Sequence, residues 1–307
     1  MPEGDSIHFA ANRLRPALVG GPLDAVSTPS ARTAGRGWPE RLAGATVTAV
    51  QARGKHLLIL FDGGLVLHSH LRMHGSWAVR PNEDAATASA AVRTATDGAS
   101  ARPETTRAGS AAAVPSGVTV VSGDTAEVRA HGRLGRPLRR AWIVMSRDGH
   151  EVIQFDGPFL ELRSAAQVAA DPRLAGLGPD ICAEAPLDVD RVIRRLRQDD
   201  PHRPAGDALL DQRTVAGFGN VWKSEACHLV GLDPWRPLAQ TTDDELRHLL
   251  VTVEPLMKRC AVDGTGHRPK AVYGRRDRRC ERCGDTIVSR KMGDDNRNTW
   301  WCPGCQT

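Results

Sequence analysis

The stretch that decides the fold is LLDQRTVAGFGNVWKSEA, residues 209–226. Apolar residues recur at helical spacing in its first half, the run stops at Ala216-Gly217-Phe218-Gly219, and a second helix is predicted from Asn220. Glycines permit a tight turn between two helices, and asparagine is a favourable N-cap. Unbonded amides at the second helix start, with the positive end of its dipole, predict a site for a DNA phosphate. Such a turn serves packing as often as binding, so both interpretations stay open.

Around this stretch the chain is predicted to be helical. Thr242, followed three residues later by Glu245, fits a capping box. We therefore predict a linker over 166–185 and a helical domain over 186–265. The segments with apolar residues at helical spacing are PLDVDRVIRRLRQ, GDALLDQRTV, NVWKSEACHLVGL and TTDDELRHLLVTVEPLMKRC.

The N-terminal half has strand character. A helix is predicted from Asp5 to Leu14, and short alternating apolar runs follow it. Gly63-Gly64 and the RDGH tetrapeptide at 147–150 each join two such runs and predict β-hairpins. Residues 1–165 are thus predicted to form an all-β domain. Within it, residues 82–130 are rich in Ala, Thr, Ser and Gly, which predicts a disordered insertion.

Four cysteines cluster at the C-terminus, in the segment 266–307. Cys280 and Cys283 are separated by two residues, as are Cys302 and Cys305, and eighteen residues lie between the pairs. Four thiolates at this spacing can close tetrahedrally on one Zn²⁺, and a closed tetrahedral site is structural. The intervening segment suits a β-hairpin carrying the basic residues Arg290, Lys291 and Arg297. Such a hairpin is either a solvated basic loop or a finger laid against phosphates.

Composition narrows the class of protein. The chain has 307 residues, a net charge of +5 and a pI near 9.0, which favours a polyanionic partner. No apolar run is long enough for a transmembrane helix, and no secretory signal opens the chain, so a cytoplasmic protein is expected, associated with the nucleoid in a bacterium. The abundance of arginine over lysine is attributed to a GC-rich genome. The other cysteines, Cys182, Cys227 and Cys260, lie in apolar surroundings typical of core residues.

Six motifs in a fixed order resemble the formamidopyrimidine-DNA glycosylase / endonuclease VIII family of base-excision repair enzymes. This resemblance implies an α+β multidomain fold. A β-sandwich would precede a helix–two-turn–helix domain with a zinc-finger hairpin, and damaged DNA would lie in the cleft between them. It also implies one structural Zn²⁺ and no catalytic metal, and a monomer is expected. The motifs are MPEGD (1–5), GKHLLI (54–59), HLRMHGSW (70–77), LGPD (177–180), the segment 209–226 and the four-cysteine hairpin.

The resemblance assigns catalytic roles to three residues. Pro2, freed by removal of Met1, would be the nucleophile, because an α-amino group has a pKa of about 7.7–8.0 and is partly neutral near pH 7. Its attack on C1′ of the nucleoside would expel the base and give an iminium ion. Glu3 would act as general acid toward the sugar ring oxygen. Lys55 would contact phosphate and assist catalysis beside the target nucleotide.

Other positions match DNA-contacting residues of the family. Asn220 and Arg297 would hold phosphates next to the lesion. Met73 would fill the gap left by a flipped-out base, although core packing is the alternative for this methionine. Glu225 is interpreted as structural. No role is assigned to the histidines His68, His70 and His74.

The predicted substrate follows from a family motif that this chain lacks. Members that excise oxidised purines carry an Arg-Arg-Phe stretch opposite cytosine, whereas this chain reads FDGPFLELR at 155–163. The absence of this stretch, together with an N-terminus that reads MPEGD and does not continue with Leu-Pro, favours the endonuclease VIII side of the family. The predicted substrates are therefore oxidised pyrimidines in DNA. We predict a bifunctional glycosylase and abasic-site lyase. The alternatives are a non-catalytic zinc-dependent DNA-binding or lesion-sensing protein, and RNA binding by the zinc hairpin.

Overall fold

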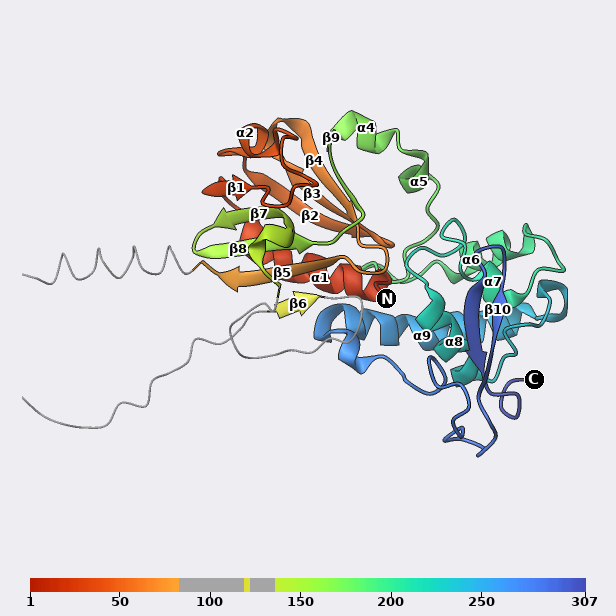
Figure 1. Cartoon of the computed structure of the whole chain (residues 1–307). Coiled ribbons are helices and arrows are strands. Elements are labelled where there is room, and N and C mark those ends of the chain that lie inside the picture. Colours follow the sequence, from red (N-terminus) through yellow and green to blue (C-terminus); the bar gives the residue numbers. More distant parts are fainter. Residues whose placement is uncertain (83–118, 122–135) are drawn as a thin grey trace, which may run out of the picture.

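The computed structural model describes residues 1–82, 119–121 and 136–307, and Figure 1 shows a β-rich N-terminal part and a helical C-terminal part. The predicted α+β order of a β-sandwich, a helical domain and a C-terminal hairpin is confirmed. Of the range 82–130, predicted as a disordered insertion, only Asn82 and strand β6 (Thr119–Val121) are described. The rest of that prediction lies outside the described residues.

Two antiparallel sheets form the N-terminal part. Their inward residues, with those of helix α1, build one hydrophobic core that includes Trp77 and Ile143. The two hairpins predicted at Gly63-Gly64 and at 147–150 are confirmed as β3–β4 and β7–β8. The first sheet has the order β2 (Val47–Arg53), β3 (His56–Phe61), β4 (Leu65–His70), β9 (Phe159–Ser164), and the second β1 (Ala25–Ser27), β7 (Ala141–Arg147), β8 (His150–Phe155), β5 (Ser76–Pro81), β6.

Helix α1 (Gly4–Leu18) is longer than the helix predicted from Asp5 to Leu14. It begins one residue earlier because Glu3 and Ser6 form a reciprocal cap, in which the Glu3 amide donates to Ser6 Oγ at 2.8 Å. It ends later because its last residues, including Leu18, are buried in the sandwich core. Short helices and turns complete this part: α2 (Trp38–Leu42), η1 (Asp62–Gly64), η2 (Leu138–Arg140), α4 (Ala165–Ala169) and α5 (Pro172–Ala175).

The helical part has its own core, in which Trp222 and Phe218 are fully buried. The capping box of Thr242 and Glu245 is confirmed at the start of its longest helix. Cys182, Cys227 and Cys260 are buried in this core, as predicted. The helices are α6 (Val189–Arg197), α7 (Ala205–Ala208), α8 (Asn220–Val230) and α9 (Asp243–Asp263), with the short turns η3 (Leu238–Gln240) and η4 (Thr265–His267).

One helical prediction is wrong over most of its length. The segment GDALLDQRTV (206–215) is helical only in its first three residues, which are the last three of α7, and the chain then turns. The Asp211 side chain accepts the Arg213 amide at 2.9 Å, a local bond that competes with helix continuation. The turn brings Gln212 against the 216–219 segment, where its Oε1 accepts the Gly217 amide at 3.1 Å.

The C-terminal hairpin consists of β10 (Val288–Met292) and β11 (Arg297–Trp301) and packs on helix α8. A small core of its own includes Val272, Ile287 and two of the four cysteines. In the described part of the chain, no helix combines the length and apolarity needed to span a bilayer.

Helix α1 lies between the two parts and contacts both (Figure 1). Its apolar face enters the sandwich core, while Asn12 Nδ2 donates to the carbonyl of Ala261 in α9 at 2.9 Å. At its start, the Gly4 amide donates to the Gly217 carbonyl at 2.8 Å. The N-terminus is therefore held directly against the turn that precedes α8.

This close approach generates a prediction for Gly4→Ala. A Cβ on Gly4 would lie 2.6 Å from Gly217 Cα, so the two backbones would have to separate. We expect the free energy of unfolding to fall by about 1–3 kcal/mol, despite the higher helix propensity of alanine. Urea denaturation measures this, with Gly266→Ala as the control because its Cβ would meet no atom within 4 Å. Equal stabilities of the two variants would contradict the prediction.

Candidate active site

The carboxylate of Glu3 occupies the start of helix α8. Its Oε1 accepts the Val221 amide at 2.8 Å and its Oε2 accepts the Trp222 amide at 3.2 Å, and the residue is fully buried. These are first-turn amides, which have no partner within the helix. The prediction that they stay unbonded for a DNA phosphate is therefore wrong, because the protein's own carboxylate takes that place.

The residue that caps α8 is Gly219, and Asn220 is the first helical residue. The predicted N-cap role of Asn220 is therefore also wrong. A Cβ on Gly219 would lie 2.2 Å from the carboxyl carbon of Glu3. Only glycine at this position lets the carboxylate reach the helix amides.

Pro2 is buried beside Glu3, at the junction of the two parts. While Met1 is present, the Pro2 nitrogen belongs to the peptide bond with Met1, whose carbonyl accepts a hydrogen bond from Arg268 Nη1 at 3.2 Å. Arg268 also donates from Nε to Asp5 Oδ2 at 2.6 Å, and Trp222 Nε1 donates to the same oxygen at 2.9 Å. A buried ion pair from the helical part thus fixes the N-terminal segment.

Lys55 lies on the β2–β3 turn, and its side chain also reaches the turn before helix α8. Its Nζ donates to the carbonyl of Phe218 at 2.6 Å, in the turn before α8. Burial, with a smaller contribution from Arg297, lowers the pKa of Lys55 to about 8 against the opposing effect of nearby Glu3. Near neutral pH this amine is charged but titrates more readily than an exposed lysine.

Asp180, the last residue of the LGPD motif, positions the turn that carries Lys55. Its Oδ2 accepts the Gly54 amide at 2.7 Å and lies 2.9 Å from His8 Nε2. Burial opposes ionisation, but the His8 contact and the amides of Gly54 and Cys182 lower the pKa of Asp180 below its usual value. The LGPD motif itself carries no sequence signal for this role of its aspartate.

Asn220 and Arg297 lie close together where the hairpin packs on α8. Asn220 is 3% exposed, and its Nδ2 donates to the carbonyl of Asn298 at 2.8 Å. Arg297 is half-exposed and pairs with Asp295 at 2.8 Å. The hairpin therefore brings a guanidinium beside the start of α8, near Lys55.

Lys223 was not predicted as a site residue. It is fully buried, and its Nζ donates to Thr299 Oγ1 at 2.5 Å across the α8–hairpin interface. Burial lowers the pKa of Lys223 to about 8. Its place within the 209–226 segment was the only available sequence signal, and sequence alone cannot tell that this lysine faces inward.

Glu225 is structural, as predicted, but its contacts hold the chain that leads to the hairpin and not the helix–turn segment. Its fully buried carboxylate accepts three consecutive amides, those of Ala271, Val272 and Tyr273, at 2.8, 3.0 and 2.7 Å. These residues lead from α9 to the hairpin. The carboxylate therefore ties the hairpin to α8.

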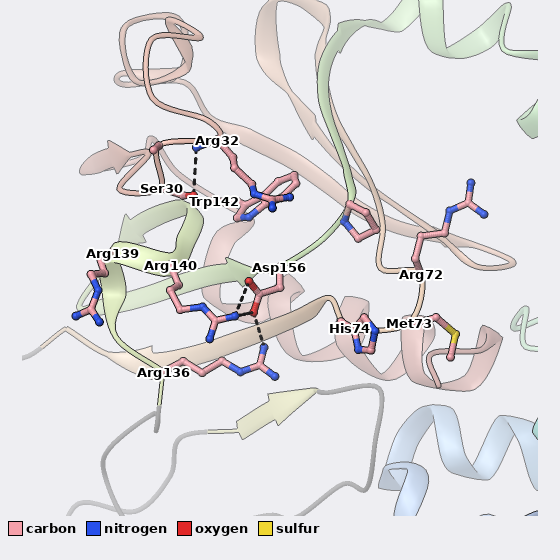
Figure 2. Close-up of a pocket in the computed structure, with 12 residues that line it drawn as sticks. Ser30, Arg32, Arg72, Met73, His74, Arg136, Arg139, Arg140, Trp142 and Asp156 are labelled. Carbon is pink, nitrogen blue, oxygen red and sulfur yellow. Dashed lines mark hydrogen bonds and ion pairs between the residues drawn. The ribbon is translucent and has the colours of Figure 1, made fainter.

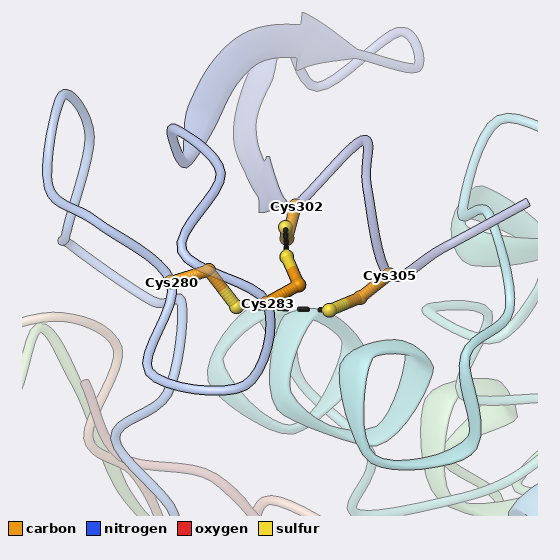
Figure 3. Close-up of side chains that lie close together, drawn as sticks. All are labelled: Cys280, Cys283, Cys302 and Cys305. Carbon is orange, nitrogen blue, oxygen red and sulfur yellow. Dashed lines mark hydrogen bonds between the residues drawn. The ribbon is translucent and has the colours of Figure 1, made fainter.

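The four cysteines converge as predicted (Figure 3). The sulfur atoms of Cys280, Cys283, Cys302 and Cys305 all lie within 4.8 Å of one another. Four thiol ligands at such separations can hold a metal ion. The cluster closes the base of the β10–β11 hairpin and contacts His228 of α8, whose Nε2 lies 3.5 Å from Cys280 Sγ.

Met73 and the histidines lie on and beside the β4–β5 connection. Met73 is 49% exposed, so core packing does not account for it. His56 Nδ1 lies 3.0 Å from His68 Nε2, and the His56 and His70 ring centroids are 4.8 Å apart. Burial lowers the pKa of His56 to about 4 and that of His68 and His70 to about 3, so these rings are neutral at physiological pH.

The neighbouring residues Pro2 and Glu3, and Lys55 from a distant part of the sequence, thus meet at the turn 216–219. This arrangement offers a nitrogen that becomes an amine after removal of Met1, a carboxyl group in the adjacent residue and a lysine amine. An amine can attack an electrophilic carbon, and a carboxyl group can transfer a proton.

Comparison with known proteins gives one consistent result. Family models described as the formamidopyrimidine-DNA glycosylase N-terminal domain and H2TH domain match residues 1–110 and 177–270. A probable endonuclease 8 2 of Streptomyces coelicolor is 33% identical over the whole chain and 94% of that protein. A DNA-(apurinic or apyrimidinic site) lyase of Mycolicibacterium smegmatis is 31% identical over the whole chain and 99% of that protein.

Solved structures show the same fold. A Lactococcus lactis formamidopyrimidine-DNA glycosylase bound to DNA with an abasic site superposes with a TM-score of 0.70, at 20% identity and 99% coverage of both chains. The same enzyme in complex with DNA containing an oxidised pyrimidine gives a TM-score of 0.69 at 20% identity, with full coverage of both chains.

The contacts of Glu225 generate a prediction for Glu225→Ala. Three buried amides would lose their acceptor, so we expect the free energy of unfolding to fall by about 3 kcal/mol or more. Thermal or urea denaturation measures the change. Glu281→Ala is the control, because Glu281 is 76% exposed and, among the described residues, pairs only with Arg275. A loss no larger than that of the control would show that the three bonds are dispensable.

Proposed function

The chain belongs to the formamidopyrimidine-DNA glycosylase / endonuclease 8 family, and on this premise we propose that it excises oxidised bases from DNA and cleaves the strand at the resulting abasic site. The observation that supports this most strongly is the position of the first residues. Buried Pro2 and Glu3 are docked on the start of α8, and Lys55 reaches the same turn. Relatives that match over their full length are named endonuclease 8 and DNA-(apurinic or apyrimidinic site) lyase, and these names support the proposal.

The proposed reaction begins with Pro2 after removal of Met1. Its nitrogen bonds to C1′ of the damaged nucleotide as the bond to the base breaks, and the base leaves with the bonding electron pair and takes up a proton. Opening of the sugar ring breaks the C1′–O4′ bond and turns the C1′–proline bond into an iminium. Glu3, held by the α8 amides, supplies the proton that O4′ needs.

Strand cleavage follows from the iminium. The cationic nitrogen withdraws electrons and acidifies the C2′ hydrogen, so loss of that proton expels the 3′ phosphate. Water then hydrolyses the iminium and releases the amine. No redox cofactor takes part in these steps.

Lys55, Asn220 and Arg297 are proposed to hold the phosphates beside the damaged nucleotide. An asparagine amide has two N–H donors, and one of those of Asn220 is used by Asn298, so the second is available for a phosphate oxygen. The guanidinium of Arg297 offers a bidentate contact. Exposed Met73 is proposed to fill the gap left by the flipped base.

The boundaries 1–165, 166–185, 186–265 and 266–307 are proposed as the domain divisions of this enzyme. We further propose Zn²⁺ as the ion of the four-cysteine cluster. With four protein thiolates it leaves no position for water, so its contribution is to fold the hairpin that carries Arg297.

Trapping tests the proposed chemistry. Sodium borohydride reduces an iminium, so we expect the enzyme to become covalently attached to DNA carrying an abasic site. Pro2→Gly, or a tag retained before Pro2, should abolish base excision and leave DNA binding largely intact, whereas the same tag at the C-terminus should have no effect. Normal excision by the blocked enzyme would place the nucleophile elsewhere. Binding without any trapped complex would indicate a lesion-sensing protein.

Metal loss tests the hairpin. Cys302→Ser should release the ion and lower DNA affinity while the β-sandwich stays folded, because structural zinc contributes folding free energy directly. Elemental analysis and circular dichroism measure the two effects. Cys182→Ser is the control, since Cys182 lies outside the cluster. Wild-type protein purified without zinc would refute the assignment.

Lesion choice is proposed to favour oxidised pyrimidines. The turn at 155–159 contains no arginine, so the chain lacks the Arg-Arg-Phe stretch that purine-excising members of the family place opposite cytosine. We expect thymine glycol and dihydrouracil to be removed faster than 8-oxoguanine opposite cytosine, with single-stranded substrate accepted. Single-turnover cleavage of matched oligonucleotides measures these rates. Faster removal of 8-oxoguanine would assign the chain to the purine-excising branch.

A further inference from the structure

A pocket of about 900 Å³ lies beside the β4–β5 connection and away from Pro2, Glu3 and Lys55, none of which lines it. Figure 2 shows arginine side chains around its wall. Five of its lining residues are arginines and one is an aspartate, so its charge is strongly positive. The arginines are Arg32, Arg72, Arg136, Arg139 and Arg140, and Asp156 is the carboxylate.

Two of the five arginines are held in place by ion pairs with Asp156. Arg136 Nη1 lies 3.2 Å from Asp156 Oδ2, and Arg140 Nη2 lies 3.0 Å from the same oxygen (Figure 2). One carboxylate therefore faces two guanidinium groups and cannot neutralise both. Arg136 also donates to Ser76 Oγ at 3.3 Å, which ties it to strand β5.

The other arginines leave their charge available. Within the described residues, neither Arg32 nor Arg139 forms an ion pair, and both are exposed. Arg32 lies over the ring of Trp142, with 5.9 Å between its guanidinium carbon and the ring centroid. Its loop is held to β7, because Thr33 Oγ1 donates to the Trp142 carbonyl at 2.7 Å. The loop that carries Arg32 is thus fixed against the sheet by this hydrogen bond.

The topology separates this pocket from the catalytic residues. Lys55 belongs to the sheet that contains β4, whereas the pocket lies along the other sheet, at the ends of β7 and β8. The connection that carries Met73 crosses from one sheet to the other. Met73 lines the pocket from this connection, at the boundary between the two sheets.

We propose that this pocket binds the phosphate backbone of the undamaged strand of a duplex, on the side of Met73 opposite the flipped nucleotide. The inference rests on the proposed function. If Met73 enters the gap in the stack, the damaged strand lies toward Lys55 and the complementary strand lies toward the arginines. Guanidinium groups bind phosphates without reading bases, so this contact favours duplex over single-stranded DNA and carries no preference for the opposite base.

The experiment measures affinity of the full-length protein for one oligonucleotide with a stable abasic analogue, single-stranded and in duplex, over a range of salt. For Arg139→Ala we expect duplex affinity to fall about twofold to tenfold, with the salt slope reduced by about one. Affinity for the single strand should fall less, so the ratio of duplex to single-strand affinity decreases. Arg32→Ala should act in the same direction, and the double variant should lose more than either.

Arg259→Ala is the matched control, because Arg259 is an exposed arginine of α9 paired with Asp263 of its own helix. Its affinity ratio should equal that of the wild type. Equal losses on both DNA forms, or an unchanged ratio in the double variant, would overturn the proposal. A loss that depends on the base opposite the lesion would overturn it too, since it would mean base reading. Failure of the proposed function is distinguishable, because it abolishes borohydride trapping by the wild type and leaves these affinities measurable.

Discussion

The arrangement of the site depends on the bond between the Glu3 carboxylate and the first amides of helix α8. It joins residue 3 to residues 221 and 222 and satisfies amides that the helix itself cannot. A carboxylate is also stabilised by the positive end of a helix dipole. Through this contact the N-terminus becomes part of the helical domain, and Pro2 is brought into the junction between the two halves of the chain.

The same kind of contact, in which a carboxylate accepts backbone amides or pairs with an arginine, recurs around the junction. Asp180 binds the turn before Lys55, Glu225 binds the chain leading to the hairpin, and Asp5 pairs with Arg268. Carboxylates that are buried, as in Asp5 and Glu225, or partly buried, as in Asp180, are costly unless they are hydrogen-bonded, and each of these accepts several donors. An arrangement of the two parts that left one of these carboxylates with fewer hydrogen-bond donors would therefore be less stable. The junction is therefore specified by polar contacts, whereas the two hydrophobic cores stabilise the parts on either side of it.

The basic residues fall into two groups with different physical roles. Lys55 and Arg297 converge on the start of α8, where burial and mutual repulsion affect the lysine. The arginines around the pocket are mostly exposed and lie along the other sheet. With exposed Met73 lining the pocket at the connection between the two sheets, the surface suits a duplex whose strands part at one nucleotide. The proposed preference for pyrimidine lesions and the proposed backbone contact are compatible, because phosphate contacts position DNA without identifying its bases.

The sequence by itself determined the class of fold, the four-cysteine cluster, both hairpins and the capping box at Thr242, because each is encoded by local spacing. The tertiary structure decided what the first amides of α8 bind: they were predicted to be free for phosphate, but Glu3 takes them. It likewise decided that Lys223 faces inward and that arginines far apart in the sequence share a pocket. Such pairings depend on how the two halves pack, and residue spacing along the chain does not encode distances between segments hundreds of residues apart.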